Sequence, residues 1–124
     1  MTTVAAQRDD ASAAWFDGLA QGRLLIRTCR SCGHHSRPET ATCPACHGPA
    51  LAWTAAAGVG TVVCVITDHL TGVPATLGLV ELDEGPWLLV RVSGASRPSA
   101  GTRVCLSVHH AEGSEPISVF TTDF

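Results

Sequence analysis

The sequence has no lysine and no tyrosine, and it contains only three phenylalanines and three tryptophans. All eight of its basic residues are therefore arginines, and the formal net charge is −3. Proteins that bind single-stranded nucleic acid combine a basic groove with aromatic side chains that stack on the bases. A net acidic chain with so few aromatic residues argues against that function. The absence of lysine is itself typical of a high-GC coding bias and points to no function.

Long apolar segments are also missing. No run of apolar residues is long enough to span a membrane, and residues 1–10 lack the apolar core of a secretory signal. We therefore expect a cytoplasmic protein with no membrane segment, in which thiols stay reduced. Residues 1–8 are expected to be disordered. A chain of 124 residues has little apolar area with which to stabilise a fold, so a structural metal is plausible.

No catalytic constellation is visible. The acid–base candidates near predicted strand ends and turns are Asp68, His69, Asp83, Glu84, His109 and His110. Their spacing assembles neither a catalytic triad nor a carboxylate pair, so we expect no catalytic residue and no residue that binds an organic cofactor. Residues 58–61 lack the third glycine and the following helix of a phosphate loop. A bend at the entry of a strand explains this glycine-rich stretch better.

Two matched cysteine pairs, Cys29 with Cys32 and Cys43 with Cys46, are the strongest feature of the sequence. Two cysteines separated by two residues let one tight turn aim both sulfurs at one point. Two such turns supply the four soft ligands of a tetrahedral zinc ion. The four cysteines therefore predict a closed metal site that favours zinc, although the same ligands also suit a rubredoxin-like iron.

Neighbouring residues support tight turns at both pairs. Gly33 follows the first pair, Gly48 stands two residues after the second, and both offer the positive φ that such a turn needs at its exit. Pro44 sets φ at the entry of the second turn. Residues 43–47 also match a thioredoxin-type redox pair and a c-type haem attachment, but neither a βαβ unit nor an export signal is predicted. A disulfide pair is the remaining alternative, and His47 is expected to be a solvated neighbour rather than a ligand.

The first predicted element is a short helix that begins after Asp9 or Asp10 as its N-cap and ends before Gly22. Trp15 and Leu19 fall on one face of this helix. So short an amphipathic helix is not stable alone in water. It must dock, and the sequence leaves open whether it docks on its own domain or on a partner.

Strands are predicted on both sides of the cysteine pairs. Residues 23–27 and 51–53 are expected to pair, with residues 34–42 as the loop at the tip of the ribbon. The two histidines of this loop, His34 and His35, are expected to be solvated.

From Trp53 onward the pattern changes to five short strands separated by turn clusters. They are residues 61–69, 75–82, 87–92, 103–109 and 117–121. We therefore predict a mainly β fold: an N-terminal helix, a rubredoxin-like zinc ribbon and a five-stranded antiparallel barrel of the OB-fold type. The expected divisions are residues 1–22 for the tail and helix, 23–52 for the zinc ribbon and 53–124 for the OB-fold. Cys64 and Cys105 are expected to be buried thiols within strands.

Several short motifs together resemble a known family over nearly the whole chain, from about Trp15 to Phe124. They are Trp15–Leu19, Gly22–Leu24, Cys29-x-x-Cys32-Gly33, Cys43-Pro44-x-Cys46, Trp53, Gly58-x-Gly60-Thr61-Val62 and Val80–Pro86. The family is that of the zinc-ribbon OB-fold proteins associated with acyl-CoA metabolism, long catalogued as a domain of unknown function. The chain departs from the family pattern at residues 35–38, where an aromatic residue followed by prolines is common.

The resemblance implies a non-catalytic accessory subunit in a hetero-oligomer with a thiolase-superfamily enzyme. That enzyme would be a thiolase, a sterol-carrier-type thiolase acting as an aldolase in lipid or steroid metabolism, or an acyltransferase or ketosynthase-like protein. In some such assemblies a hot-dog hydratase is also present, and the small subunit shapes the acyl-CoA entrance.

Two alternatives remain open. The first is a stand-alone acyl-CoA-binding module in which Arg91, Arg97 or Arg103 meets the phosphates, and the second, less favoured, is a single-stranded nucleic-acid-binding OB-fold. Composition adds one further expectation: with 45% hydrophobic and 15% charged residues, the chain should expose an apolar patch. We expect the Trp15 helix and the ribbon to make the partner contacts.

Overall fold

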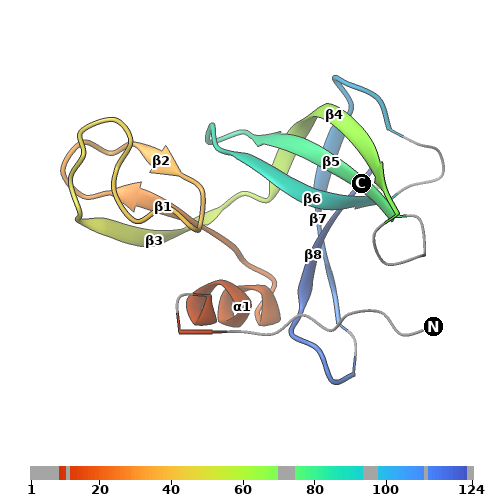
Figure 1. Ribbon diagram of the computed structural model, residues 1–124, viewed down its shortest axis with the longest axis horizontal. Coiled ribbons are helices and arrows are strands. Elements are labelled where there is room, and N and C mark those ends of the chain that lie inside the picture. Colours follow the sequence, from red (N-terminus) through yellow and green to blue (C-terminus); the bar gives the residue numbers. More distant parts are fainter. Residues whose placement is uncertain (1–8, 11, 70–74, 94–97, 111, 123–124) are drawn as a thin grey trace.

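The computed structural model describes residues 9–10, 12–69, 75–93, 98–110 and 112–122, so the disorder expected for residues 1–8 lies outside the described part. In chain order the elements are α1 (Ala13–Ala20), β1 (Leu24–Cys29), β2 (His35–Ser36), β3 (Leu51–Ala56), β4 (Val59–Asp68), β5 (Ala75–Leu82), β6 (Trp87–Ser93), β7 (Arg103–His109) and β8 (Ile117–Thr121). Figure 1 shows a small sheet of β1–β3 beside a barrel of β4–β8, with α1 below both. The expected fold class is confirmed.

The helix α1 has Ser12 as its N-cap residue, so it begins two to three residues later than the expected N-cap at Asp9 or Asp10. Asp9 nevertheless closes the preceding turn. Its Oδ1 accepts a hydrogen bond from the Ser12 N–H at 2.8 Å, and Ser12 Oγ accepts one from the Asp9 N–H at 2.9 Å. This reciprocal pattern is that of a capping box. Gly22 lies past the end of the helix, as expected, and has a positive φ of 76°.

The helix docks on its own chain through one face. Leu19 is fully buried, and a Cβ at Gly18 would lie only 2.8 Å from Leu25 Cγ, so the helix backbone runs tightly against β1. Trp15 and Phe16 are only partly buried, at the border of the core. Of the two alternatives for this helix, docking on its own domain therefore holds for Leu19.

The ribbon is a three-stranded antiparallel sheet in the order β2-β1-β3. Pairing of Leu24 with Ala56 through Cys29 with Leu51 confirms the expected partnership of β1 and β3. The tip is more ordered than expected because β2 lies within it. His35 pairs with Thr28, and its Nδ1 is 2.9 Å from the Thr28 Oγ1. The expectation that His35 is solvated is therefore wrong.

The barrel is closed in the order β4-β5-β6-β8-β7, with β7 returning to β4. This five-stranded closure is consistent with an OB-fold. The expectation of a wholly antiparallel barrel is wrong at one seam: β6 and β8 run parallel, with Arg91 opposite Val119. The reason is topological, because the β7–β8 hairpin places β8 between β6 and β7 and gives β8 the direction of β6.

A β-bulge in β4 changes which side chains face outward. Val62 pairs with Val80, but the next pair is Cys64 with Leu79, so Val63 is an extra residue. A bulge of one residue inverts the alternation of side chains that follow it. Cys64 is therefore exposed and Ile66 is 49% exposed. The expectation that Cys64 is buried is wrong for this reason, and Cys105 is only half-buried.

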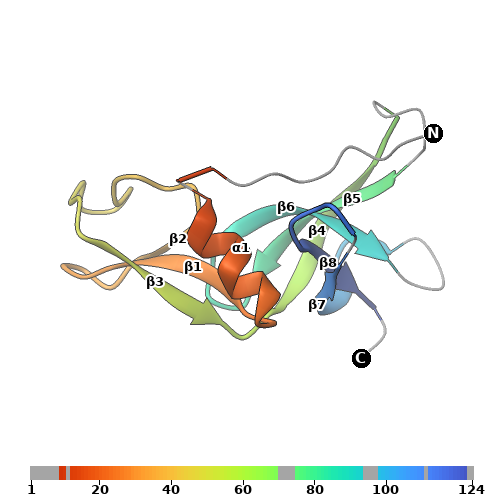
Figure 2. The ribbon, with the colours of Figure 1, turned by 90° about the horizontal axis from the view of Figure 1, so that it is seen from below.

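Helix, ribbon and barrel share one hydrophobic core. Its buried members are Leu19, Leu24, Ile26, Val62, Val80, Leu82, Leu88, Val90, Val92, Val104 and Phe120. Figure 2 shows α1 lying across the junction between the ribbon and the barrel. Because β1 contributes core residues at one end and Cys29 at the other, the cysteine turns project from a strand that is anchored in the common core.

Among the described residues, no helix is both long and apolar enough to cross a membrane.

Candidate metal centre and adjacent cleft

The two cysteine pairs occupy turns with the same hydrogen-bond pattern. In each turn the first cysteine accepts a hydrogen bond from the N–H four residues on and donates one to the carbonyl five residues on. Gly33 donates to Cys29 at 2.9 Å, and His47 donates to Cys43 at 2.8 Å. The N–H of Cys29 donates to the His34 carbonyl, and the N–H of Cys43 donates to the Gly48 carbonyl, each at 2.9 Å. Equivalent turns facing each other are what a four-thiolate site requires.

The backbone conformation at the turn exits is met by different residues in the two turns. Gly33 has φ 78°, as expected. In the second turn the positive φ belongs to His47, at 63°, and not to Gly48. Gly48 has another role, because a Cβ there would lie 3.3 Å from the Cys46 Sγ. The small residue leaves room for the sulfur.

The four sulfurs are arranged as a tetrahedral metal site requires. All four Sγ atoms lie within 4.8 Å of one another, with Cys29 and Cys46 at 3.6 Å and Cys32 and Cys43 at 3.6 Å. Zinc–sulfur bonds of about 2.3 Å in a tetrahedron place the sulfurs about 3.8 Å apart. A disulfide would need about 2.05 Å, and all four cysteines are free thiols. The donor set therefore fits zinc.

Hydrogen bonds within the turns already favour negative charge on the first cysteine of each pair. The N–H of Cys32 stabilises the Cys29 thiolate and lowers the pKa of Cys29 to about 6. The N–H of Cys46 lowers the pKa of Cys43 in the same way. The N–H of His34 favours the Cys32 thiolate, but the adjacent Cys43 sulfur and burial outweigh it and raise the pKa of Cys32 to about 12. A divalent cation would hold all four as thiolates, with release of protons.

Elsewhere in the described part of the chain, no other three His, Cys, Asp or Glu side chains converge closely enough to hold a metal ion. His34 and His47 are exposed and lie outside the sulfur cluster. As a closed site with four protein ligands, the cluster would leave no position for a water molecule that zinc could activate. Such a site is of the structural type, not the catalytic type.

The acid–base candidates are not brought together as a catalytic group. Asp83 forms a bidentate ion pair with Arg103, at 2.7 Å and 3.0 Å, and hydrogen bonding to this guanidinium holds the pKa of Asp83 below its usual value. Glu84 Oε2 accepts a hydrogen bond from the Ala57 N–H at 2.8 Å. His69 and His109 are exposed. The two carboxylates thus have structural partners at the end of the barrel.

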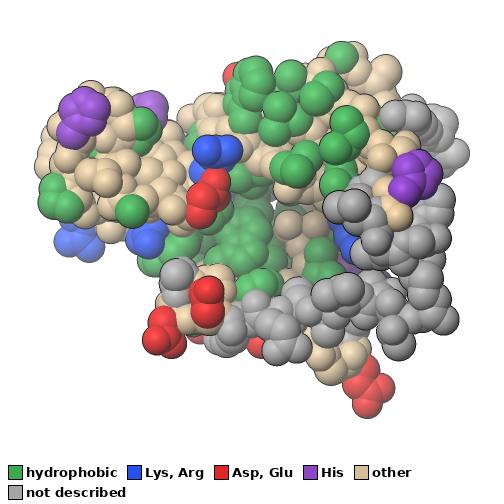
Figure 3. All heavy atoms as spheres, in the orientation of Figure 1, with side chains coloured by type: hydrophobic (Ala, Val, Ile, Leu, Met, Phe, Trp, Pro, Cys, Tyr) green, Lys and Arg blue, Asp and Glu red, His purple; other side chains and the backbone are tan. Residues whose placement is uncertain are grey.

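A cleft of about 710 Å³ separates α1 and the ribbon from the barrel. Its lining includes Trp15, Phe16 and Trp53 on one side and Leu88 and Leu89 on the other. Figure 3 shows it as a hollow with apolar side chains at its base. This cleft was not expected from the sequence, because it depends on how two separately predicted units pack against each other.

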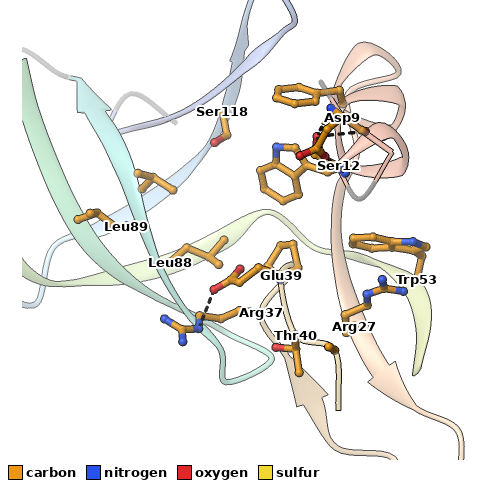
Figure 4. Close-up of a pocket in the computed structure, with 15 residues that line it drawn as sticks. Asp9, Ser12, Arg27, Arg37, Glu39, Thr40, Trp53, Leu88, Leu89 and Ser118 are labelled. Atoms are coloured by element: carbon orange, nitrogen blue, oxygen red, sulfur yellow. Dashed lines mark hydrogen bonds and ion pairs between the residues drawn. The ribbon is translucent and has the colours of Figure 1, made fainter. Parts of the chain in front are cut away.

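Charged side chains occupy defined places around the cleft (Figure 4). Arg37 is paired with Glu39 at 3.1 Å. The Arg27 guanidinium lies 3.8 Å from the centroid of the Trp53 ring, and the Arg27 Nε is buried without an acceptor. Asp9 lies at the opposite end, beside α1, where its carboxylate bonds to Ser12.

Family models match two adjoining parts of the chain. Residues 16–52 match the model described as the ChsH2 rubredoxin-like zinc ribbon domain. Residues 53–109 match the model described as the ChsH2 C-terminal OB-fold domain. The two matches follow each other without a gap and together cover most of the chain. A comparison with curated proteins gave no match.

Solved structures agree with these matches. A chain of the structure described as the Ltp2-ChsH2(DUF35) aldolase superposes with a TM-score of 0.77 at 29% identity, covering 96% of this chain and 98% of that one. A DUF35-family protein of unknown function from Sulfolobus solfataricus superposes with a TM-score of 0.65 at 17% identity, covering 93% and 85% of the two chains. The second likeness shows the shared fold alone.

Proposed function

The chain belongs to the family of ChsH2 proteins, which join a rubredoxin-like zinc ribbon to a C-terminal OB-fold, and from this premise we propose that it is a non-catalytic accessory subunit of a thiolase-superfamily enzyme. The partner that the comparisons favour is an aldolase of the Ltp2 type. In the resulting complex the partner supplies the catalytic residues, and this chain supplies a rigid, zinc-stapled surface.

One observation carries this proposal: the chain matches its relative in the Ltp2-ChsH2(DUF35) aldolase end to end, over 96% of its own length. A shared fold alone is weak support for a shared function. Here, however, the superposition spans nearly the whole of both chains, so it takes in the ribbon and the barrel together. That supports the same kind of assembly rather than the reuse of one domain in another setting.

The zinc centre has a structural role in this proposal. Cys29, Cys32, Cys43 and Cys46 are the proposed ligands, and one zinc ion would hold the two turns together. The metal supplies no catalytic step, because four protein ligands fill the tetrahedron. Instead it orders residues 30–50, which connect β1 to β3 and would otherwise depend on few core contacts. The ribbon surface offered to a partner therefore depends on the metal.

A role in shaping the acyl-CoA entrance of the complex is a finer part of the same proposal, as is a cytoplasmic location. A hot-dog hydratase would be a further partner. The stand-alone acyl-CoA-binding alternative gains no support from Arg103, because its guanidinium is already engaged by Asp83 and by Thr61 Oγ1 at 3.1 Å. Arg97 lies outside the described residues.

Native mass spectrometry of the co-expressed proteins tests the proposal. The full chain would be produced with a thiolase-superfamily protein from the same cells, and the complex would be purified through a tag on the partner. We expect a stable hetero-oligomer that carries one zinc ion for each copy of this chain. The proposal fails if the two proteins elute and ionise separately at micromolar concentration while each is folded.

A matched control distinguishes assembly from nonspecific association. Cys43→Ser removes a proposed ligand that is buried, whereas Cys64→Ser makes the same chemical change at an exposed position of the barrel. We expect the first variant to lose both zinc and the partner and the second to keep both. Loss of the partner in both variants would show that the association depends on something other than the zinc ribbon.

A further inference from the structure

The cleft between the ribbon and the barrel holds an arginine whose charge is not neutralised within the described part of the chain. Arg27 lines the cleft from β1, and its guanidinium carbon lies over the Trp53 ring, 3.8 Å from the ring centroid. Its Nε is buried with no acceptor, and the ring contact is the only interaction of the Arg27 side chain among the described residues. Buried donors in native proteins are normally satisfied. The Arg27 guanidinium, held over a ring and without an acceptor, is therefore placed to donate hydrogen bonds to a carboxylate.

The other charged side chains around the cleft already have partners within this chain. Arg37 and Glu39 neutralise each other at 3.1 Å, and Asp9 lies at the far end of the cleft, bonded to Ser12. Between these charged groups the walls are mainly apolar and aromatic, with Ser12, Thr40 and Ser118 as uncharged polar members. Leu89 is 62% exposed on the barrel wall. Among the described residues, the cleft thus combines mainly apolar walls with one positive charge that has no carboxylate partner.

We propose that this cleft is the docking site for a segment of the partner enzyme that inserts an apolar side chain between Leu89 and the tryptophans and places an aspartate or glutamate on Arg27. The inference rests on the proposed function and adds to it the position and the chemistry of the contact. Tryptophan and arginine are the residues most enriched among those that dominate binding energy at protein interfaces. Trp53 holds the guanidinium in place, so little side-chain freedom is lost when the carboxylate arrives.

A protein segment fits the cleft better than a small molecule does. Small-molecule sites enclose most of the surface of their ligand, whereas this cleft is an open hollow between two lobes (Figure 3). Its two walls come from different parts of the fold, with Arg27 and Trp53 on the ribbon and Leu89 on the barrel. A segment lying between them would contact both lobes at once.

The test measures the dissociation constant of the complex for three full-length variants. Arg27→Glu should weaken binding by roughly 30-fold or more, because a carboxylate would then face a carboxylate in a desolvated contact. Leu89→Asp should weaken it by about tenfold or more, since a charge would replace an apolar contact. Arg91→Glu makes the same charge change at an exposed arginine of β6 that does not line the cleft. The dissociation constant of the Arg91→Glu complex should stay within about twofold of that of the unchanged protein, because a charge at the rim of an interface has a small effect on affinity.

A photo-crosslinking amino acid at position 89 identifies the occupant directly, and the exposure of that position lets it be replaced without disturbing the fold. The cross-linked peptide should come from the partner and contain an acidic residue next to an apolar one. Changing that acidic residue to lysine should restore binding to the Arg27→Glu variant. Unchanged zinc content and melting temperature establish that each variant is folded. If Arg27→Glu does not fold, the cross-linked peptide and the affinity of Leu89→Asp test the proposal without it.

Three results would overturn the proposal. They are wild-type affinity in both Arg27→Glu and Leu89→Asp, a cross-link to a second copy of this chain, or a cross-link to a partner segment without a carboxylate. Failure of the unchanged chain to bind any thiolase-superfamily protein is a different result. It would contradict the proposed function, and this inference with it. A complex that forms with unchanged affinity when the cleft residues are replaced would contradict the inference alone.

Discussion

Replacement of one buried cysteine of the proposed zinc site is the sharpest perturbation that the structure offers. Cys43 is 1% exposed, and its Sγ lies 3.6 Å from the Cys32 Sγ. Structural zinc sites in small ribbons contribute about 10–16 kcal/mol of apparent binding free energy. That is as large as the whole stability of a typical domain, about 5–15 kcal/mol. Cys43→Ser should therefore unfold the ribbon, with loss of stoichiometric zinc.

The barrel should suffer less than the ribbon, because most of the buried core lies in β4–β8. Elemental analysis gives the zinc content, and hydrogen exchange resolves the two regions: protection should vanish in β1 and β3 and persist in β5 and β6. Cys64→Ser is the matched control and should change neither observable. A Cys43→Ser protein that keeps one zinc ion per chain, with wild-type protection of β1, would refute the reasoning.

Three further predictions concern the barrel. Gly60→Ala should lower the free energy of unfolding by about 1–3 kcal/mol in chemical denaturation, because the new Cβ would lie 2.5 Å from the Glu81 carbonyl oxygen. Arg103 depresses the pKa of Asp83, so the pair stabilises the fold near neutral pH and loses its effect as pH falls through the folded-state pKa, below the usual value of about 3.9; the difference in melting temperature between the unchanged protein and Asp83→Asn should shrink accordingly. Separate alanine substitutions at His69, Asp83, Glu84 and His109 should each leave turnover of the intact complex within about tenfold, or about 1.4 kcal/mol of barrier; a loss of about a thousandfold from any one would show that this chain supplies a catalytic group.

Local patterns explain why much of the architecture was predictable. The four cysteines form two pairs, each within one short turn, so the spacing predicted the cluster of four sulfurs that the structure shows. The barrel strands show alternation of buried and exposed residues, most clearly Trp87–Ser93, where every second side chain is buried. The helix limits were close because Gly22 marks the end of the helix in the sequence.

Most of the errors depend on pairing between distant parts of the chain, and one, the positive φ of His47, is local. The bulge at Val63 is not visible in a run of β-branched residues, yet it exposes Cys64. The parallel seam of β6 and β8 depends on the position of β7 in the closed barrel. His47 adopts the positive φ that a glycine would adopt more readily, and no local rule assigns it. The cleft requires the ribbon and the barrel to be placed relative to each other.

Retro-aldol turnover by the purified thiolase-superfamily partner tests the central claim most directly. It should be measured on an acyl-CoA substrate, for the partner alone, for this chain alone and for the two together. The account predicts no turnover by this chain, little by the partner and full activity when the zinc-loaded chain is added. Turnover by this chain alone, or a partner whose stability and activity are the same with and without it, would contradict the account.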